Sequence, residues 1–176
     1  MSTPWQPTLE GPTLRIRPLR ADDLEPLYAL ANDPALWAQH PEPTRWQRPV
    51  FERFFAAALA CGAAVVAERR DTGQPVGCSR YYDISAEERS VAIGYTFVAR
   101  AHWGGATNGE FKALMLAHAF ALADTVWLHI GRDNWRSRKA AEKIGAVLDR
   151  EGEREQGGTM VPYCWYRLDR PASPAA

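Results

Sequence analysis

The feature that most constrains this chain is a glycine-rich stretch between a strand-like run and a long periodic helix. The stretch reads WGGATNGEFK over residues 103–112 and follows the strand-like run Val91–Val98. Its three glycines leave the backbone free to take positive φ and to approach a ligand closely. Thr107 and Glu110 have capping-box spacing, which predicts that the helix begins here and continues to about Ala123.

A glycine-rich turn before a helix predicts one of two things. The unpaired N–H groups and the positive end of the helix dipole favour an anion such as phosphate. A tight connection between strand and helix, with no ligand, accounts for the same residues equally well. The stretch alone leaves both interpretations open.

Length and charge bound the function class. The 176 residues are 46% hydrophobic, which is enough for the core of a single globular domain. We expect that domain over residues 13–170, after a loose lead-in at 1–12 and before a disordered tail at 171–176. The 21 basic residues match the 21 acidic ones, so no overall field attracts nucleic acid.

Cysteine and histidine usage predicts no metal site. The three cysteines and four histidines are scattered and show no metal-ligand spacing. The first 12 residues lack the pattern of a signal peptide, and the longest apolar run, at 54–67, is too short to span a bilayer. We therefore expect a cytoplasmic protein that does not enter a membrane.

Hydrophobic periodicity predicts a mixed α/β domain with a single, mainly antiparallel sheet of seven strands and about four helices. The predicted strands are 14–19, 64–69, 76–84, 90–98, 125–130, 147–155 and 160–168, and the predicted helices are 22–31, 50–60, 107–123 and 135–144. Turn residues at 71–73 and 85–88 predict hairpins, so the middle three strands should form a meander.

The third strand of the meander has two unlike faces. Its odd positions 91–97 are large and predict a core face, whereas its even positions 92–98 are mostly small. The small face predicts either a slot for an extended ligand or close packing by a second layer. On the last helix, Asp133 or Asn134 caps the start and Ser137 faces inward. The basic residues around it form either a solvated face or a phosphate site.

Two further segments are candidates for contact with a substrate. Residues 35–49 place Trp37 and His40 among three prolines, a pattern typical of a binding-site wall or of a cover over the core. In the sequence Arg-Tyr-Tyr-Asp at 80–83, alternation puts Arg80 and Tyr82 on one face and their neighbours on the other. Cross-strand aromatic packing explains this run as well as a substrate patch does.

Five motifs taken together resemble the GNAT superfamily of N-acetyltransferases. They are Gly-Tyr-Thr-Phe at 94–97, the stretch at 103–112, His-Ala-Phe at 118–120, Asn-Trp-Arg-Ser-Arg at 134–138 and Glu-Lys-Ile-Gly-Ala at 142–146. The chain looks most like the Rim-type branch, the ribosomal-protein N-terminal acetyltransferases. The resemblance is strong over residues 76–146, and the order of elements extends it over nearly the whole chain.

The resemblance implies that acetyl-CoA is the cosubstrate. The turn would hold the pyrophosphate through Trp103, Gly104, Gly105, Ala106, Thr107 and Asn108. The pantetheine arm would pair with the backbone at Phe97 and Val98, where the family strand is opened by a bulge. Asn134 matches a residue that contacts the coenzyme arm, and Ser137 matches a position that can protonate the leaving thiolate.

The resemblance also implies direct attack by a primary amine, from a small molecule or a protein N-terminus, on the thioester. Many Rim-type enzymes carry a glutamate where this chain has Ala92, so Asp83, His40 and Glu110 are the candidate bases. Trp37, His40, Arg80 and Tyr82 are the candidate acceptor residues. Relatives often dimerise, and a homodimer is compatible with this sequence.

Two other functions compete with this hypothesis. Ala92 would permit a non-catalytic acyl-CoA-binding protein. A nucleotide-binding P-loop protein is disfavoured, because the turn lacks the Gly-Lys-Ser/Thr ending of that motif.

Overall fold

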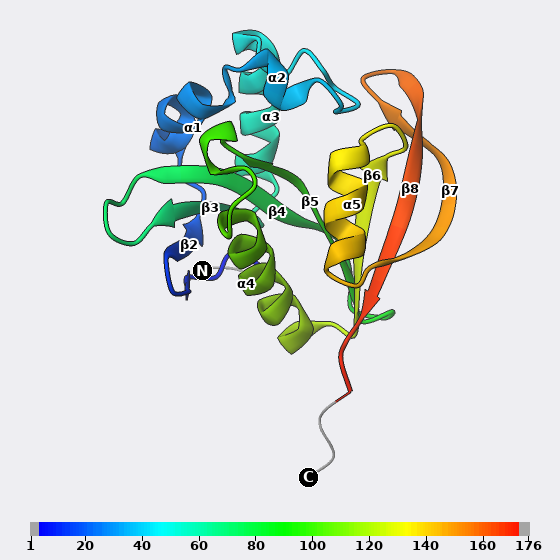
Figure 1. Cartoon of the computed structure of the whole chain (residues 1–176). Coiled ribbons are helices and arrows are strands. Elements are labelled where there is room, and N and C mark those ends of the chain that lie inside the picture. Colours follow the sequence, from blue (N-terminus) through cyan, green and yellow to red (C-terminus); the bar gives the residue numbers. More distant parts are fainter. Residues whose placement is uncertain (1–3, 173–176) are drawn as a thin grey trace.

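The computed structural model describes residues 4–172 as one mixed sheet with helices on both faces (Figure 1). Along the sheet the strand order is β1-β2-β3-β4-β5-β6-β8-β7. The strands are β1 Leu9–Glu10, β2 Leu14–Pro18, β3 Ala64–Arg69, β4 Pro75–Ser85, β5 Ser90–Val98, β6 Thr125–Gly131, β7 Val147–Gln156 and β8 Thr159–Asp169. The helices are α1 Leu24–Ala31, α2 Pro34–Trp37, α3 Arg48–Ala60, α4 Thr107–Leu122 and α5 Trp135–Lys143.

The predicted mixed α/β architecture is confirmed, with one more strand than the seven predicted. The short strand β1 pairs antiparallel with β2, placing Leu9 opposite Ile16. It lies in the segment that the sequence predicts as a loose lead-in. Trp5 is also ordered there, with its ring 5.1 Å from that of Tyr81. The predicted disordered tail falls mostly at 173–176, outside the described residues.

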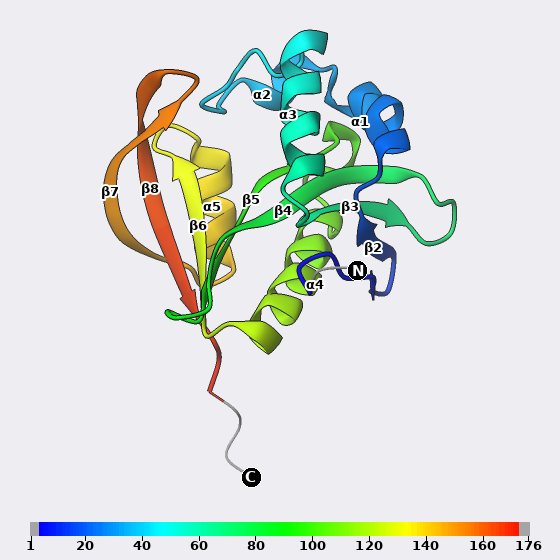
Figure 2. The same ribbon diagram turned by 180° about the vertical axis from the view of Figure 1, so that it is seen from behind.

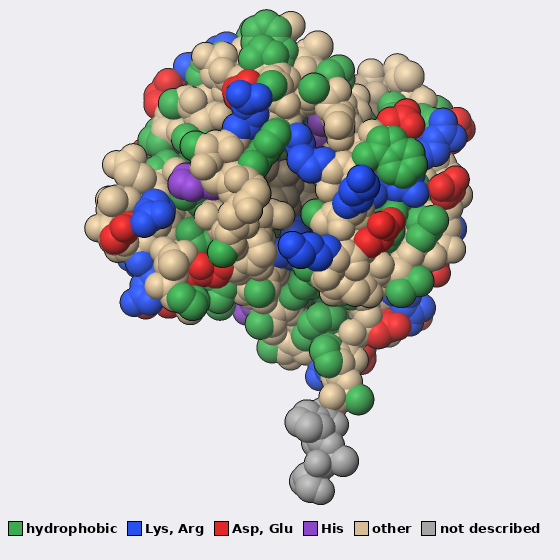
Figure 3. Space-filling view, in the orientation of Figure 1, with side chains coloured by type: hydrophobic (Ala, Val, Ile, Leu, Met, Phe, Trp, Pro, Cys, Tyr) green, Lys and Arg blue, Asp and Glu red, His purple; other side chains and the backbone are tan. Residues whose placement is uncertain are grey.

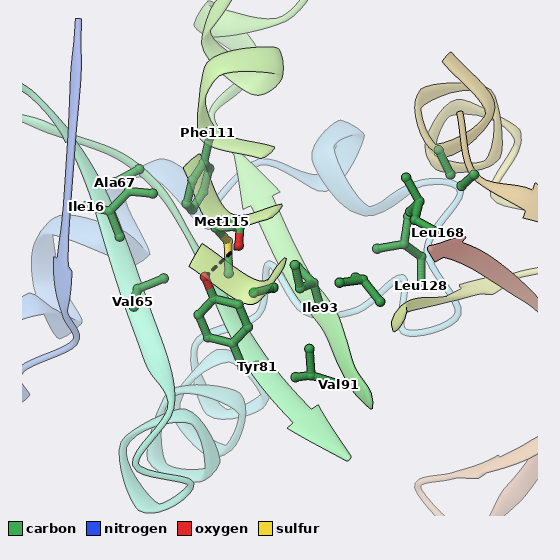
Figure 4. Close-up of a cluster of buried hydrophobic side chains, with 14 of the residues drawn as sticks. Ile16, Val65, Ala67, Tyr81, Val91, Ile93, Phe111, Met115, Leu128 and Leu168 are labelled. Carbon is green, nitrogen blue, oxygen red and sulfur yellow. Dashed lines mark hydrogen bonds between the residues drawn. The ribbon is translucent and has the colours of Figure 1, made fainter. Parts of the chain in front are cut away.

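Two apolar cores lie on opposite faces of the sheet (Figures 1 and 2). On one face α4 and α5 cover the sheet, and Phe111 and Met115 of α4 pack over Ile16, Val65 and Ile93 (Figure 4). Tyr81 joins this core and its hydroxyl donates to the Met115 carbonyl at 3.0 Å. The second core holds apolar side chains of α1, α2 and α3 against β3, β4 and β5. Burying each large side chain contributes roughly 1.5–3 kcal/mol.

The predicted capping box at the start of α4 is wrong. The N-cap residue of α4 is Ala106, and no side chain caps it. Glu110 instead reaches to the start of β2, where its carboxylate accepts from the N–H groups of Thr13 and Leu14, both at 2.8 Å. These N–H groups are bound only once the helix lies against the strand, so tertiary packing displaces the local bond.

The strands β5 and β6 diverge after a short parallel contact. Their pairing covers only Ser90–Ala92 with Thr125–Trp127. Beyond it, β5 bulges between Gly94 and Phe97, and Tyr95 takes a φ of 53°. A bulge shifts the alternation of side chains by one residue. The sheet is therefore split at its middle, between the later residues of β5 and β6.

The bulge corrects the predicted faces of β5. Val91 and Ile93 fill the first core as expected, but Phe97 lies in the second core and Val98 in the first. Tyr95 enters neither core and is 36% exposed. On the small face, the Tyr82 ring closes over Gly94, where an added Cβ would lie 2.9 Å from a ring atom. The space beside Gly94 is therefore filled by a side chain of the neighbouring strand β4 and not by a second layer.

Candidate active site

The turn before α4 leaves its backbone open. Gly104 has a φ of 74°, and a Cβ added at Gly104, Gly105 or Gly109 would meet nothing within 4 Å. The first N–H groups of a helix have no intrahelical partner, and here no side chain caps them. Exposed N–H groups at the positive end of a 16-residue helix fit a phosphate group.

Trp103 connects this turn to two other elements. Its indole Nε1 donates to the Val98 carbonyl at 2.9 Å. The Ala99 N–H donates to Val76 on β4, so strand alternation turns the Val98 amide toward the open side of β5. The Arg136 guanidinium of α5 lies 3.9 Å from the Trp103 ring centroid. The ring thus spans the opening between β5 and α5.

The start of α5 lies on the other side of this opening. Asn134 is the cap, since its side chain accepts from the Ser137 N–H at 3.3 Å. Ser137 is half-buried, whereas Arg138 is 9% exposed and points inward. The Arg138 Nε donates to the Tyr166 hydroxyl at 3.0 Å and its Nη1 to the Arg132 carbonyl at 2.9 Å. Arg138 is therefore part of the buried structure and not of a phosphate-binding surface.

A cavity of about 290 Å³ lies between the segment after α2 and the β7–β8 hairpin. Its lining is mostly aromatic and basic, and consists of His40, Arg45, Tyr82, Tyr95, His129, Arg154, Glu155, Gln156, Gly157 and Tyr163. We call this cavity the arginine pocket.

Figure 3 shows a hollow in the surface between α4 and α5, with Lys and Arg side chains beside it.

Two of the predicted acceptor residues, His40 and Tyr82, line the arginine pocket. Trp37 does not line it, because it is 2% exposed and belongs to the second core. Its Nε1 donates to the Ala31 carbonyl at 2.9 Å, and its ring meets His40 edge-on at 5.5 Å between centroids. Trp37 is thus part of the second core and contacts His40 from there.

Arg80, the fourth predicted acceptor residue, lies beside the pocket in an unusual environment. It is 9% exposed, and its guanidinium lies 3.4 Å from the Tyr95 ring centroid. Arg45 is 6% exposed, and its guanidinium lies 4.6 Å from the Phe54 ring centroid. The Nε atoms of both arginines have no hydrogen-bond partner among residues 4–172.

Asp83 lies at the edge of the pocket near His129. Its φ is 46°, so it leaves the alternation that placed it on the face of Tyr81. One carboxylate oxygen lies 3.8 Å from His129 Nδ1, and the side chain is 61% exposed. Arg154 Nη1 lies 2.6 Å from the same Nδ1. Because guanidinium only donates, Nδ1 is the acceptor and the proton lies on Nε2.

Burial, with Arg154 and Arg150 nearby, lowers the pKa of His129 to about 4. Burial and Arg45 likewise hold the pKa of His40 well below its usual range. Both imidazoles are neutral at pH 7, and the Nδ1 of each already accepts a hydrogen bond. Of the three base candidates, Glu110 is engaged at β2 and His40 is a weak base. Asp83 is the carboxylate at the pocket edge.

The sequence indicated only part of this pocket. Alternation in β6 could have placed His129 beside Trp127, which pairs with Ala92. Arg45 lies in an irregular segment, and Arg154 and Tyr163 lie on a hairpin joined to β6 only through β8. No local pattern links these residues to Tyr82.

Two absences apply to the part of the chain that the structure covers, residues 4–172. No group of three or more His, Cys, Asp or Glu side chains there could hold a metal ion. No helix there is long and apolar enough to cross a membrane.

The structure combines an uncapped helix start after a glycine-rich turn, a split sheet and a pocket lined mostly by aromatic and basic side chains. The chain belongs to the family of acetyltransferase (GNAT) domains, whose model matches residues 13–147. Members of this family use acetyl-CoA as the cosubstrate. A search of curated proteins found no match to the sequence.

Solved structures share the fold at low sequence identity. A GCN5-related N-acetyltransferase from Brucella melitensis is 17% identical with a TM-score of 0.81, over 93% of this chain and 79% of that one. A GNAT-family acetyltransferase from Bacillus anthracis is 16% identical with a TM-score of 0.75, over 93% and 98%. RimJ from Mycobacterium smegmatis, in complex with CoA-disulfide, is 19% identical with a TM-score of 0.74, over 96% and 90%.

Proposed function

We propose that this protein transfers the acetyl group of acetyl-CoA to a primary amine by direct attack. The observation that carries the proposal is the opening between β5 and β6, which has an uncapped helix N-terminus at one end and the arginine pocket near the other. A transferase needs two such sites, because placing two substrates together supplies much of the rate.

The coenzyme would be held by the turn and by the two sides of the opening. Gly104, Gly105, Ala106, Thr107 and Asn108 would offer backbone N–H groups to the pyrophosphate. The pantetheine arm would run along β5 at Phe97 and Val98, beside Trp103 on the same side. Asn134 and Ser137, at the start of α5, would contact the arm from the opposite side.

The amine would enter from the pocket side, past His40, Tyr82 and Arg80, with Trp37 supporting His40. Its nitrogen would bond to the thioester carbon, and collapse would break the carbon–sulfur bond. The amine proton would pass to Asp83, directly or through water, and Ser137 would protonate the departing thiolate. Ala92 has no ionisable side chain and cannot be the base. It is fully buried and pairs with Tyr82 of β4.

The acceptor would be a small-molecule amine or a protein N-terminus. The similarity to Mycobacterium smegmatis RimJ, together with the turn and α5 motifs, supports membership of the Rim-type branch. We further propose a cytoplasmic enzyme and a homodimer as its assembly. The burial of Ala92, where no carboxylate is present, favours one alternative function, a non-catalytic acyl-CoA-binding protein.

Two measurements separate these functions. Calorimetric titration with CoA tests the coenzyme site, and thiol release from acetyl-CoA across a panel of amines and peptides tests transfer. Turnover with at least one acceptor supports the enzyme. CoA binding without turnover on any acceptor supports the binding protein, and no CoA binding contradicts both.

A further inference from the structure

Two buried arginines at the pocket are packed on aromatic rings. Arg45 and Arg80 are more than nine-tenths buried. Neither forms an ion pair with a carboxylate within 4 Å among residues 4–172. Arginine is almost never buried without a partner, because taking a charge out of water costs several kcal/mol. An anion bound in the pocket would supply such a partner.

Arg45 lines the pocket, and Arg80 contacts one of its lining residues. The Arg45 Nη1 lies 3.2 Å from His40 Nε2. Arg80 is stacked on Tyr95, another lining residue, at 3.4 Å. Burial lowers the pKa of Arg45 to about 10, and the nearby charge of Arg80 acts in the same direction. The two cations are thus close enough to repel each other.

A third arginine completes the set from the opposite wall. Arg154 lines the pocket and its guanidinium lies 5.7 Å from the ring centroids of both Tyr82 and Tyr163. Glu155 is the one acidic residue of the lining, and its carboxylate already accepts from the Gly158 N–H at 2.6 Å. Glu42 makes no ion pair with Arg45 within 4 Å. The described lining therefore carries two arginines against one glutamate, with the carboxylates of Glu42 and Asp83 nearby.

We infer that the arginine pocket binds an oxyanion carried by the acceptor itself, so that the substrate is a small amine bearing a carboxylate or phosphate group. This inference rests on the proposed function and names its substrate class. Guanidinium groups match the planar, two-oxygen geometry of a carboxylate or phosphate. A cavity of about 290 Å³ with three tyrosines in its lining suits a small molecule whose body is aromatic or aliphatic.

The test compares amines that differ only in the anionic group. The pairs are phenylalanine with 2-phenylethylamine, β-alanine with ethylamine, and phosphoethanolamine with ethanolamine. We expect the anionic member of at least one pair to show a kcat/KM at least tenfold higher. The first two pairs report a carboxylate and the third a phosphate. Equal rates within every pair overturn the inference.

Variants connect that preference to the arginines. Arg45→Gln and Arg154→Gln should remove the preference by raising the KM of the anionic member at least tenfold more than the KM of the uncharged member. Arg53→Gln, on the exposed face of α3, is the matched control and should retain the preference. An unchanged preference in both pocket variants overturns the inference.

A binding measurement keeps the inference testable if no acceptor is acetylated. Titration of the CoA-loaded protein with each amine should show binding of the anionic member only, and Arg45→Gln should abolish it. Failure of turnover with retained anion binding contradicts the proposed function and supports this inference. Turnover of uncharged amines without anion binding supports the proposed function and contradicts this inference.

Discussion

The two proposed anion sites are built in opposite ways. The turn before α4 uses backbone N–H groups in open space, with glycines that leave the surface bare. The arginine pocket uses long side chains that are buried and stacked on aromatic rings. An open dipole costs little to maintain without a ligand, whereas a buried cation without a partner is costly. The first site should tolerate an empty state better than the second.

The largest expected effect is at the open turn. Gly105→Asp places a carboxylate where the pyrophosphate would bind, and like charges at about 4 Å cost about 3–4 kcal/mol at an intermediate dielectric. We expect coenzyme affinity to fall at least about 100-fold, measured by calorimetry. Ala117→Asp makes the same charge change on an exposed face of α4 and should leave affinity nearly unchanged. Equal losses in both variants would mean that net charge, not the turn, decides binding.

A smaller effect, on stability, is expected at Gly77, where the backbone of β5 leaves no room for a side chain. A Cβ at Gly77 would lie 2.0 Å from the Phe97 carbonyl oxygen, so Gly77→Ala must separate β4 from β5 at the bulge that presents Tyr95 to the pocket. We expect a loss of about 1–3 kcal/mol in the free energy of unfolding, measured in urea. Gly109→Ala, in open space on α4, should instead be neutral or stabilising by up to about 1 kcal/mol. Similar stabilities for the two variants would contradict this contrast.

The link between the open turn and the sheet gives the next effect. Partial burial would raise the pKa of Glu110, but hydrogen bonds from Thr13 and Leu14 outweigh it and lower that pKa. Glu110→Gln weakens bonds to a charged acceptor and should cost about 1–2 kcal/mol at pH 7. A group with a lowered folded pKa loses its contribution as the pH falls below its unfolded value, near 4.5, and through the folded value.

Urea unfolding at a series of pH values checks this expectation. The difference between the wild type and Glu110→Gln should be constant from pH 7 to about 5 and should shrink below that. A difference that does not change down to pH 3 would show that the carboxylate charge has no role.

The smallest effect concerns Trp103, which connects the open turn to β5 and α5. Trp103→Phe removes the bond to the Val98 carbonyl but keeps an aromatic face for Arg136. We expect a loss of about 0.5–1.5 kcal/mol in stability and little change in selectivity between anionic and uncharged amines. Trp103→Ala, which also removes the face under Arg136, should cost more. If Trp103→Phe changes acceptor selectivity, the two sites are coupled through this ring.

Local signals account for what could be predicted from the sequence. The seven long strands, the start of α4 and the Asn134 cap depend on neighbours within a few residues, as does the glycine turn. Periodicity and capping chemistry act at that range. The family could also be predicted, because five such local motifs occur in the order that is typical of it.

Only the tertiary structure decided how these elements meet. Glu110 accepts from two N–H groups at the start of β2 and not from its predicted cap, and Arg138 turns inward to Tyr166. The bulge at Tyr95 shifted one face of β5 by a residue, which no alternation rule could anticipate. The arginine pocket collects Arg45 and Arg154 from separate segments, and Arg80 of β4 lies beside it. The pocket exists only after folding, because other segments bury these guanidinium groups and supply the aromatic rings on which they stack.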